Sequence, residues 1–400
     1  LVASEGGSTR GFATTLQKAL AAQGALVHVG PMTGFDPARW PRARRIILLA
    51  ATYGDGAAPA SASGFLGDFQ RHPAKPGLPL AVLGFGDRSF PAFCGFAAEI
   101  DRIAGERGWS KLLPFDTVDR QSPQVFARWG CDLAKALGMD FELNHQRTTP
   151  KTWELSLVSR RDYGENLQAK TSMLRFALPR TSIWQRLICT GMPRFEAGDL
   201  IGVLPKGSDL PRLYSLASGT RDGFVEICVR KQAGGLCSGQ LTALEPGSTI
   251  PAFVQPNPAF RPTRDQKPVI LIGAGTGIGP LAGFARANHA HRPMHLYFGA
   301  RHPASDALYA EELSDWKQDG RLTSVSTAYS RTPTPAYVQD ILRKDATRLG
   351  RFVTSGGQVL VCGGRDMAAG VAAAITDILA PEGLNVAMLK AEGRYAEDVF

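Results

Sequence analysis

A glycine-rich loop, residues 273–280, follows the apolar run 269–272 and precedes an expected helix over residues 281–288. A strand, a glycine turn and a helix start leave backbone N–H groups exposed, and the helix dipole adds a positive potential. Such a segment can bind a phosphate or another anion. Its spacing differs from the Rossmann pattern G-x-G-x-x-G because Ile278 occupies the third glycine position. Taken alone, the loop could equally be a tight turn between a strand and a helix.

Basic residues end the two strand candidates that follow this loop. The first ends at Arg301 and the second at Ser330 and Arg331, with Tyr337 and Gln339 close behind. A site that prefers NAD would place a carboxylate about twenty residues after the loop, to bind the ribose hydroxyl. A guanidinium can instead bind the 2′-phosphate of NADPH through two hydrogen bonds. Ser330 with Arg331 therefore favours NADPH, whereas Arg301 alone could be a solvated surface charge.

Three loops in the first 145 residues carry a second set of chemically useful groups. Residues 4–9 offer hydroxyl and N–H groups at an expected helix start, which suits a phosphate. Residues 51–56 present Tyr53, and residues 84–90 present Phe90. An anion anchor with aromatic rings on two neighbouring loops would suit a planar, phosphorylated ring system.

These loops must be positioned by a parallel sheet, because apolar runs alternate with helical patterns in this part of the chain. The expected strands are residues 26–29, 46–51 and 80–84. Phe12, Leu16 and Leu20 form one face of an expected helix that ends near Gly24. In an open parallel sheet, ligands bind beyond the carboxyl ends of the strands, which is where all three loops lie.

The pattern changes twice along the rest of the chain. Residues 146–152 are polar and contain Pro150, which predicts a linker. Short alternating segments such as 224–229 then predict an antiparallel barrel over residues 153–265. Strands and helices alternate again over residues 266–400, with expected strands at 269–272, 295–298, 324–329 and 359–362. The predicted fold class is therefore α/β, with a doubly wound sheet in residues 1–145, then a β-barrel, then an α/β nucleotide domain.

Composition limits the function classes. The chain has 400 residues, 44% of them hydrophobic, which is enough for two or three domains with buried cores. A formal net charge of +9 permits acidic partners or a membrane surface, but no run of Lys or Arg resembles a nucleic-acid-binding arm. The six cysteines are scattered, which argues against a disulfide framework or a metal site and favours a reducing compartment.

The longest uncharged run, residues 269–285, is broken by glycines and Pro280, so we expect no membrane helix there. Because the chain opens at Leu1 without an initiator Met, we expect further sequence upstream.

The three N-terminal loops resemble the flavodoxin family in sequence and order. Ser-x-x-Gly-Ser-Thr, Ala-Thr-Tyr-Gly-x-Gly and Gly-x-Gly-Asp-x-x-(aromatic)-x-x-Phe-Cys all occur. The resemblance implies a flavodoxin-like sheet that binds FMN, with Tyr53 and Phe90 on the two faces of the ring and Asp87 and Asp116 along its edge. Gly6 stands where the family usually has Thr, and Phe90 where Tyr is commoner. The FMN-binding residues implied are Ser4, Glu5, Gly6, Gly7, Ser8, Thr9, Thr52, Tyr53, Gly54, Gly56, Gly86, Asp87, Phe90, Phe93 and Asp116.

Residues 212–215 (Arg-Leu-Tyr-Ser) resemble the Arg-x-Tyr-Ser motif of the ferredoxin–NADP reductase family. The resemblance implies FAD, with Arg212 at a flavin phosphate, Tyr214 against the isoalloxazine and Ser215 near its reactive nitrogen. Residues 234–238 resemble the loop that holds the FAD diphosphate in that family. The FAD-binding residues implied are Arg212, Leu213, Tyr214, Ser215, Gly235, Leu236, Cys237, Ser238 and Phe400.

The same resemblance implies how NADPH is bound and where hydride is transferred. Ser215, Cys362 and Asp398 would surround the reacting atoms, and Phe400 would cover the flavin where relatives more often have Trp or Tyr. The NADP-binding residues implied are Gly275, Thr276, Gly277, Arg301, Ser330, Arg331, Tyr337, Gln339 and Cys362.

The order of these motifs is similar to that of the diflavin reductases of the NADPH–cytochrome reductase and sulfite reductase flavoprotein class. The connecting domain of that class is missing, because residues 198–205 lead to Arg212 within a few residues. The resemblance implies a cytoplasmic enzyme that passes electrons from NADPH through FAD and FMN to a one-electron acceptor, such as a haem protein, a sulfite reductase-type partner or a ferric complex. An alternative is the cytosolic module of a membrane-anchored ferric or siderophore reductase, tethered upstream of residue 1 to a haem or metal-reductase domain. A third is a scaffold protein that keeps the fold without flavin.

Overall fold

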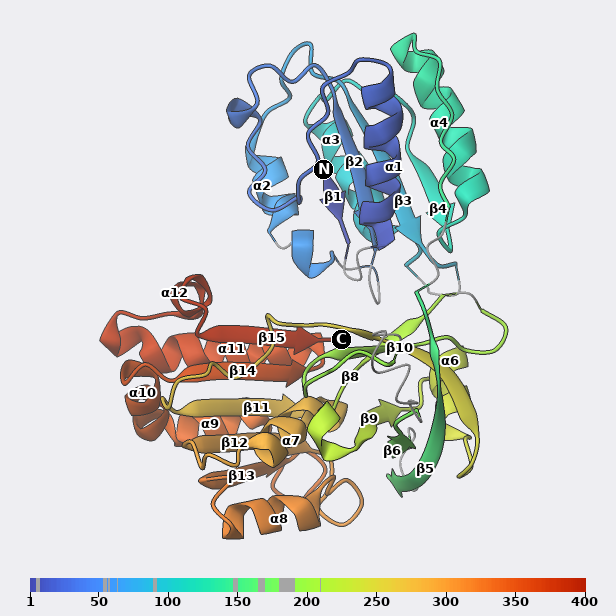
Figure 1. The fold of residues 1–400 in the computed structure, drawn as a ribbon. Coiled ribbons are helices and arrows are strands. Elements are labelled where there is room, and N and C mark those ends of the chain that lie inside the picture. The colour runs from blue at the N-terminus through green and yellow to red at the C-terminus, as the bar shows by residue number, and fades with distance from the viewer. Residues whose placement is uncertain are drawn as a thin grey trace. The chain divides into compact units, whose positions relative to one another are not determined.

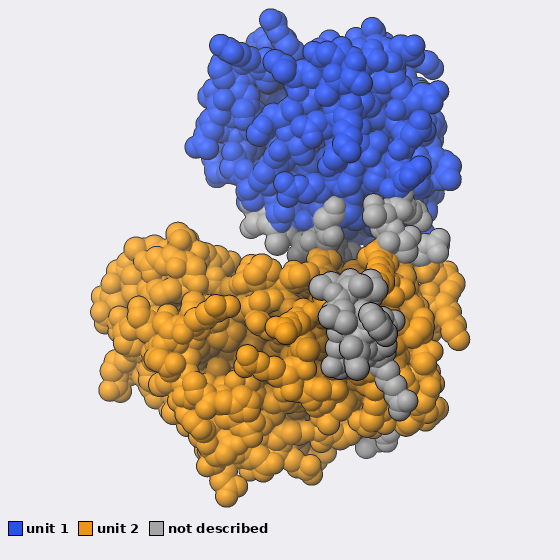
Figure 2. All heavy atoms as spheres, in the orientation of Figure 1, with its two compact units in different colours: residues 1–149 blue, residues 150–400 orange. Residues whose placement is uncertain are grey.

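The computed structural model describes residues 1–4, 8–52, 56, 58–62, 64–88, 92–146, 150–164, 170–179, 191–208 and 210–400. The chain divides into two compact units, Leu1–Thr149 and Pro150–Phe400, which Figure 2 shows in blue and orange. We call them the first and the second unit. None of the described helices is both long and apolar enough to cross a membrane.

The first unit is a parallel sheet between two layers of helices (Figure 1). Alternate residues of one strand face opposite sides of the sheet, so each face has its own core. One core packs α2 and α3 on the sheet, and the other packs α1 and α4. The strands, in sheet order, are β1 (Val2–Ala3), β2 (Ile46–Ala51), β3 (Leu80–Gly86) and β4 (Asp116–Asp119). The helices are α1 (Ser8–Ala22), α2 (Phe65–Arg71), α3 (Gly95–Glu106) and α4 (Pro123–Leu137), with short turns η1 (Pro37–Arg39) and η2 (Ala60–Ala62).

Helix α1 confirms the prediction from apolar spacing. Phe12, Leu16 and Leu20 are buried on one face of the helix. The chain leaves the helix at Gly24, whose φ of 79° lies in the left-handed region that glycine adopts without strain.

The strand predicted over residues 26–29 is wrong. Residues 26–29 have no ladder contact; just after them the Val2 N–H donates to Gly30 O at 2.9 Å, and a single bridge joins Val2 to Pro31. Pro31 has no N–H with which to extend the pairing, and the Leu26 side chain is fully exposed. Alternating apolar residues alone did not supply the partner strand that a ladder requires.

The second unit begins with a six-stranded antiparallel barrel, as the sequence predicted. A bridge between Leu216 and Ile227 joins the two edge strands β8 and β9 and closes the barrel. In sheet order the strands are β8 (Arg212–Ser215), β7 (Leu200–Val203), β10 (Thr249–Gln255), β5 (Trp153–Tyr163), β6 (Thr171–Ala177) and β9 (Phe224–Arg230). The turn η3 (Thr220–Asp222) and helix α6 (Leu236–Thr242) flank β9.

The second unit continues with a five-stranded parallel sheet. In sheet order its strands are β13 (Ser324–Tyr329), β12 (Met294–Ala300), β11 (Val269–Ala274), β14 (Gln358–Gly363) and β15 (Tyr395–Val399). The other elements are η4 (Gly275–Gly277), α7 (Ile278–Ala287), α8 (Ala310–Gln318), α9 (Val338–Lys344), α10 (Ala346–Thr354), α11 (Arg365–Leu379), η5 (Ala380–Glu382) and α12 (Val386–Ala391). Helices α9, α10 and α11 cover one face of this sheet. Helices α7 and α8 cover the other, in a core that also includes Cys228 and Ala217 of the barrel. The barrel and the nucleotide sheet therefore share one core.

Candidate functional site

The loop after β1 holds a buried hydroxyl at the predicted phosphate site. The Ser4 N–H donates to Ser61 Oγ at 2.9 Å, and Ser61 Oγ donates back to the Ser4 carbonyl at 2.8 Å. Ser4 Oγ is itself buried and has no hydrogen-bond partner among the described residues. A buried hydroxyl without a partner is costly, so an anion accepting from Ser4 Oγ would fit here. Sequence reasoning missed Ser61, since no local pattern brings η2 to β1.

The ends of β2 and β3 lie at the same sheet edge because all four strands run parallel. Thr52 continues the ladder, with its N–H donating to Phe85 O at 2.8 Å. Gly56 has a φ of 102°, and a Cβ there would lie 2.7 Å from Cβ of Ala92. Glycine is therefore required at Gly56, which fits its place in the predicted FMN site.

Two carboxylates lie at this edge, the predicted Asp87 and a second one, Asp119, that the sequence did not single out. Asp87 follows β3 and accepts a hydrogen bond from Arg120 Nε at 3.1 Å. Asp119 pairs in register with Gly86 at the end of β3 and accepts from the Arg88 N–H at 3.0 Å. Asp116 pairs with Leu83, three residues before the edge, and its carboxylate binds Arg128 of α4. Asp87 and Asp119 thus lie at the carboxyl ends of β3 and β4, whereas Asp116 begins β4, and its role at the FMN ring stays a prediction.

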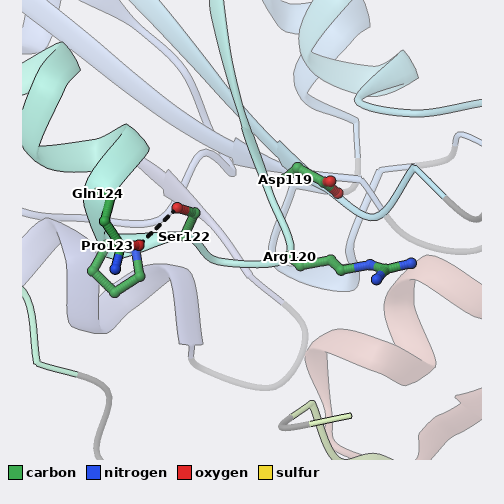
Figure 3. A pocket seen from close by; sticks show the side chains of 5 residues that line it. All are labelled: Asp119, Arg120, Ser122, Pro123 and Gln124. Atoms are coloured by element: carbon green, nitrogen blue, oxygen red, sulfur yellow. Dashed lines mark hydrogen bonds between the residues drawn. The ribbon is translucent and has the colours of Figure 1, made fainter. Parts of the chain in front are cut away.

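A shallow pocket lies between the end of β4 and the start of α4 (Figure 3). Arg120 and Gln121 both have left-handed backbones, with φ of 47° and 54°, which non-glycine residues rarely adopt. Ser122 ends this turn by accepting the Val125 N–H at 3.3 Å as the N-cap of α4. The pocket-lining residues are Asp119, Arg120, Ser122, Pro123 and Gln124.

The remaining predicted FMN residues fall into two groups. The first group lies in the described part of the chain. Ser8 and Thr9 begin α1, and Thr9 is buried. The Phe93 ring has the Arg88 guanidinium 5.0 Å from its centre. The residues Glu5, Gly6, Gly7, Tyr53, Gly54 and Phe90 lie outside the described part of the chain, and their roles stay predictions.

In the second unit, three predicted catalytic residues meet. Ser215 is the last residue of β8, and its Oγ donates to Asp398 Oδ2 at 2.5 Å. The Cys362 Sγ lies 3.9 Å from the same oxygen, because β14 and β15 run parallel with Cys362 opposite Asp398. Cys362 is fully buried, and burial together with the Asp398 charge raises the pKa of its thiol far above the usual value. The thiol is therefore protonated at neutral pH and does not act as a thiolate.

The flavin motif lies on β8 beside helix α6. Burial raises the pKa of Tyr214, and the neighbouring Cys237, to which it is hydrogen bonded, raises it further. Ser238 Oγ accepts from the Gln232 N–H at 3.1 Å and donates to the Gly235 carbonyl at 3.3 Å, so it shapes its own loop. Arg212 and Leu213 are half-buried on the same strand, while Leu236 at the start of α6 is about half exposed, with 49% of its surface accessible. A neutral phenol and an exposed apolar side chain are compatible with a flavin ring and its tail.

The glycine-rich loop lies on the end of β14. A Cβ at Gly277 would lie 2.1 Å from the carbonyl oxygen of Cys362, so no side chain fits there. Gly275 has a left-handed φ of 56° and is exposed, and Thr276 beside it is half-buried. The loop therefore presents its outer residues to solvent next to Cys362, as an anion-binding turn would.

The residues predicted for the 2′-phosphate lie at the ends of β12 and β13. The Ser330 N–H donates to Ala300 O at 3.0 Å, and the Arg331 N–H donates to Arg301 O at 2.7 Å. Arg301 and Arg331 therefore emerge from neighbouring strand ends, with Arg331 exposed.

Two further predicted nucleotide residues lie just beyond. Tyr337 has 53% of its surface exposed at the start of α9. Gln339 faces α11, since a Cβ at Gly370 would lie 3.4 Å from the Gln339 side chain. The structure thus leaves Tyr337 accessible, whereas it packs Gln339 against a neighbouring helix.

Arg230, at the end of β9, is a candidate that sequence reasoning missed. Burial lowers the pKa of its guanidinium, and the nearby charge of Arg301 lowers it further, against the opposing effect of Asp306. Two arginines, one from the barrel and one from the nucleotide sheet, thus approach each other, as groups that share an anion would. The signal in the sequence was the basic end, Arg230 and Lys231, of the strand candidate 224–229.

Phe400 follows β15 on the same side of the unit. Its N–H donates to Gly363 O at 3.1 Å, and it lies two residues after Asp398, which pairs in register with Cys362. Half of its surface is exposed. Its ring is therefore accessible beside the meeting point of Ser215, Cys362 and Asp398.

Comparisons with known proteins agree with this arrangement. The Flavodoxin family matches residues 1–129, and the family described as oxidoreductase NAD-binding domain matches residues 271–373. The sulfite reductase [NADPH] flavoprotein alpha-component of Serratia proteamaculans is 32% identical over 67% of this chain and 48% of its own length. The corresponding protein of Thiocapsa roseopersicina is 26% identical over 96% of this chain and 84% of its own. Nitric oxide synthase 3 of Sus scrofa is 36% identical over 48% of this chain and 19% of its own. The chain thus spans about half the length of the Serratia protein.

Proposed function

The chain belongs to the diflavin reductase class, and from this membership we propose that it oxidises NADPH and delivers the electrons singly to an acceptor. In this proposal FAD accepts hydride in the second unit, and FMN in the first unit hands electrons on. The observation that carries the proposal is the meeting of Ser215, Cys362 and Asp398, which come from the barrel, β14 and β15.

These three residues suit hydride transfer between two planar rings. Ser215 is held by Asp398, so its hydroxyl is oriented before any ligand binds, which reduces the entropic cost of reaching the reactive geometry. Cys362 offers a neutral, polarisable side chain where a nicotinamide would pack. Asp398 keeps the serine oriented, and its charge holds the proton on the thiol.

The chain's other residues would bind the ligands. FAD would be held by the residues on β8 and α6, with Tyr214 against the ring. FMN would be held at the edge where Ser4 Oγ has no partner within the described part of the chain and where Asp87 and Asp119 end their strands. NADPH would bind with its pyrophosphate at Gly275, Thr276, Gly277 and the pair Arg230 and Arg301, and its 2′-phosphate at Ser330 and Arg331.

The name of the Serratia relative supports a sulfite reductase-type protein as the electron acceptor. A membrane-anchored ferric or siderophore reductase has no comparable support among the relatives.

Flavin content and NADPH-dependent reduction test the proposal together. The purified chain is expected to release FAD and FMN in equal amounts and to reduce both ferricyanide and a cytochrome with NADPH. FAD without FMN would refute the two-flavin relay, and a colourless protein that binds neither flavin would favour a scaffold.

A further inference from the structure

Glu226 on β9 is a buried carboxylate with no part in the reaction proposed above. Only 1% of its surface is exposed, yet three side chains from different elements donate to it. Arg175 of β6 does so through Nε at 2.9 Å and Nη2 at 2.7 Å. Arg286 of α7 does so at 2.6 Å and the Tyr309 hydroxyl at 3.0 Å. A buried charge satisfied in this way holds its partners in one geometry.

Arg286 connects helix α7 to the barrel through more than Glu226. Its Nη1 donates to the carbonyl of Ala217 at 2.6 Å. Its guanidinium also lies 5.2 Å from the centre of the Phe224 ring and 5.5 Å from that of Trp316. The orientation of Arg286 is thus fixed by charge, by a backbone carbonyl and by two aromatic rings.

Gly283 brings the backbone of α7 directly onto the barrel. A Cβ at this position would lie 2.5 Å from Cβ of Ala197 and 2.7 Å from the carbonyl oxygen of Ala217. These separations are shorter than any real contact, so only glycine fits without moving the helix. Helix α7 therefore contacts Ala217 at two positions, Arg286 and Gly283.

These contacts join the two halves of the hydride-transfer site. On the barrel side, Ala217 lies two residues after Ser215. On the nucleotide side, α7 begins directly after Gly277, which lies against the carbonyl of Cys362. Any shift of α7 relative to the barrel would change the separation between Ser215 and Cys362.

We propose that Glu226, Arg286 and Gly283 are positioning residues that set the distance between the bound nicotinamide and the flavin. This inference rests on the proposed function. Since displacement of reacting groups by about 1 Å can cost on the order of a hundredfold in rate, loosening this contact should affect the hydride step more than binding.

Charge removal tests the first part of the contact. Arg286→Met and Glu226→Gln, each in the flavin-loaded full chain, are mixed rapidly with NADPH and with its 4-deuterated form. We expect flavin reduction to slow by about tenfold or more, with a larger isotope effect and an NADPH dissociation constant within about twofold of wild type. Asp345→Asn is the control. Asp345 accepts hydrogen bonds from Tyr297 and Arg348 on the face of the nucleotide sheet that lies opposite helix α7. Its reduction rate is expected to match wild type, and variants at Glu226 and Arg286 that also match it would overturn the inference.

Gly283→Ala tests the contact without altering any charge, and it remains informative if the charge variants do not fold. Gly350→Ala in α10 is its matched control, because a Cβ there meets nothing within 4 Å while the gain in helix propensity is the same. Hydrogen exchange of the flavin-free protein gives a second readout. Amides of residues 278–287 should exchange faster in Gly283→Ala than in wild type or Gly350→Ala, and equal exchange would contradict the positioning role. A wild-type protein that NADPH cannot reduce would refute the proposed function, while the exchange comparison would still test the contact.

Discussion

Asp398 is the residue on which the proposed chemistry depends most. Its carboxylate accepts from Ser215, which belongs to the barrel, and lies 3.9 Å from the Cys362 thiol of the nucleotide sheet. One charge therefore orients a hydroxyl and adds to the effect of burial, which raises the pKa of the Cys362 thiol. Neither effect requires Asp398 to exchange a proton itself.

Asp398→Asn should slow hydride transfer while leaving ligand binding nearly intact. The amide keeps the shape of the carboxylate but loses the charge that orients Ser215, a loss of about 1.5–3 kcal/mol for a hydrogen bond to a charged group. We expect the rate of flavin reduction by NADPH in rapid mixing to fall by about tenfold or more. Glu397→Gln is the control on the same strand, since Glu397 pairs with Lys390 instead. Equal rates for the two variants would exclude the role assigned to Asp398.

Arg331→Ala should discriminate between the two nicotinamide cofactors. If its guanidinium binds the 2′-phosphate, the Michaelis constant for NADPH should rise about tenfold or more, because a charge-assisted pair is lost. NADH lacks that phosphate, so its constant should change by less than about twofold. Arg343→Ala, an arginine paired only loosely with Asp377, serves as the control in steady-state ferricyanide reduction. Similar increases for NADPH and NADH would show that Arg331 does not contact the 2′-phosphate.

His295 should make the second unit sensitive to acid. Its ring is buried, is hydrogen bonded to Ser324 Oγ at 2.9 Å and stacks on Phe352 at 4.0 Å. Burial, with a smaller effect of the Arg348 charge, lowers its pKa from 6.5 to about 4. The unfolded chain thus binds the proton more readily, and the stability present above pH 6.5 should be lost as the pH falls towards 4, by about 3 kcal/mol.

His295→Gln provides the comparison, because an amide can bond to Ser324 but does not titrate in this range. Urea unfolding of both proteins between pH 4 and pH 7 should show the smaller loss of unfolding free energy in the variant. Parallel pH profiles would mean that His295 is not responsible.

Individual motif residues could be predicted from the sequence, whereas residues recruited by folding could not. Ser215 and Cys362 stand in motifs that resemble those of the ferredoxin–NADP reductase family, so the resemblance implied both. Ser61 and Asp119 reach the site through a loop approach and a strand register, and no local pattern encodes either.

Strands and helices with strong periodicity were predictable because their apolar faces meet a core. Strand β13 has the bounds predicted from the sequence, Ser324–Tyr329, and both faces of its sheet are covered by helices. Residues 26–29 are also largely apolar, but the hydrogen bond at this sheet edge goes to Gly30 beyond them, and they form no strand. Pairing, which depends on distant residues, decides between these two outcomes.

The loop between β11 and α7 should tolerate no side chain at Gly277. Gly277→Ala would place a methyl group 2.1 Å from the Cys362 carbonyl, so either η4 or β14 must move. We expect lower thermal stability and at least about a tenfold weaker affinity for NADP⁺, measured by titration calorimetry. Gly239→Ala in α6 is the control, because a Cβ there meets nothing within 4 Å. Wild-type affinity in Gly277→Ala would contradict the close approach of the loop to β14.

The proposed reaction divides between the two units of the chain. Hydride from NADPH is accepted within Pro150–Phe400, where the barrel and the nucleotide sheet share a core. In this proposal, electrons pass to the acceptor from the unit Leu1–Thr149, which contains the predicted FMN loops. The order of motifs in the sequence predicts this division between the two units.

Selective removal of FMN from the full chain should separate the two activities. Ferricyanide is small and can accept electrons wherever a reduced flavin is accessible, whereas a protein acceptor needs the route through the first unit. We therefore expect the FMN-depleted protein, with FAD retained, to keep most of its NADPH–ferricyanide activity and to lose cytochrome reduction by more than about tenfold. Re-addition of FMN should restore cytochrome reduction, which controls for damage during depletion. If the depleted protein still reduces the cytochrome at the original rate, electrons leave directly from the second unit, and the first unit must have another task.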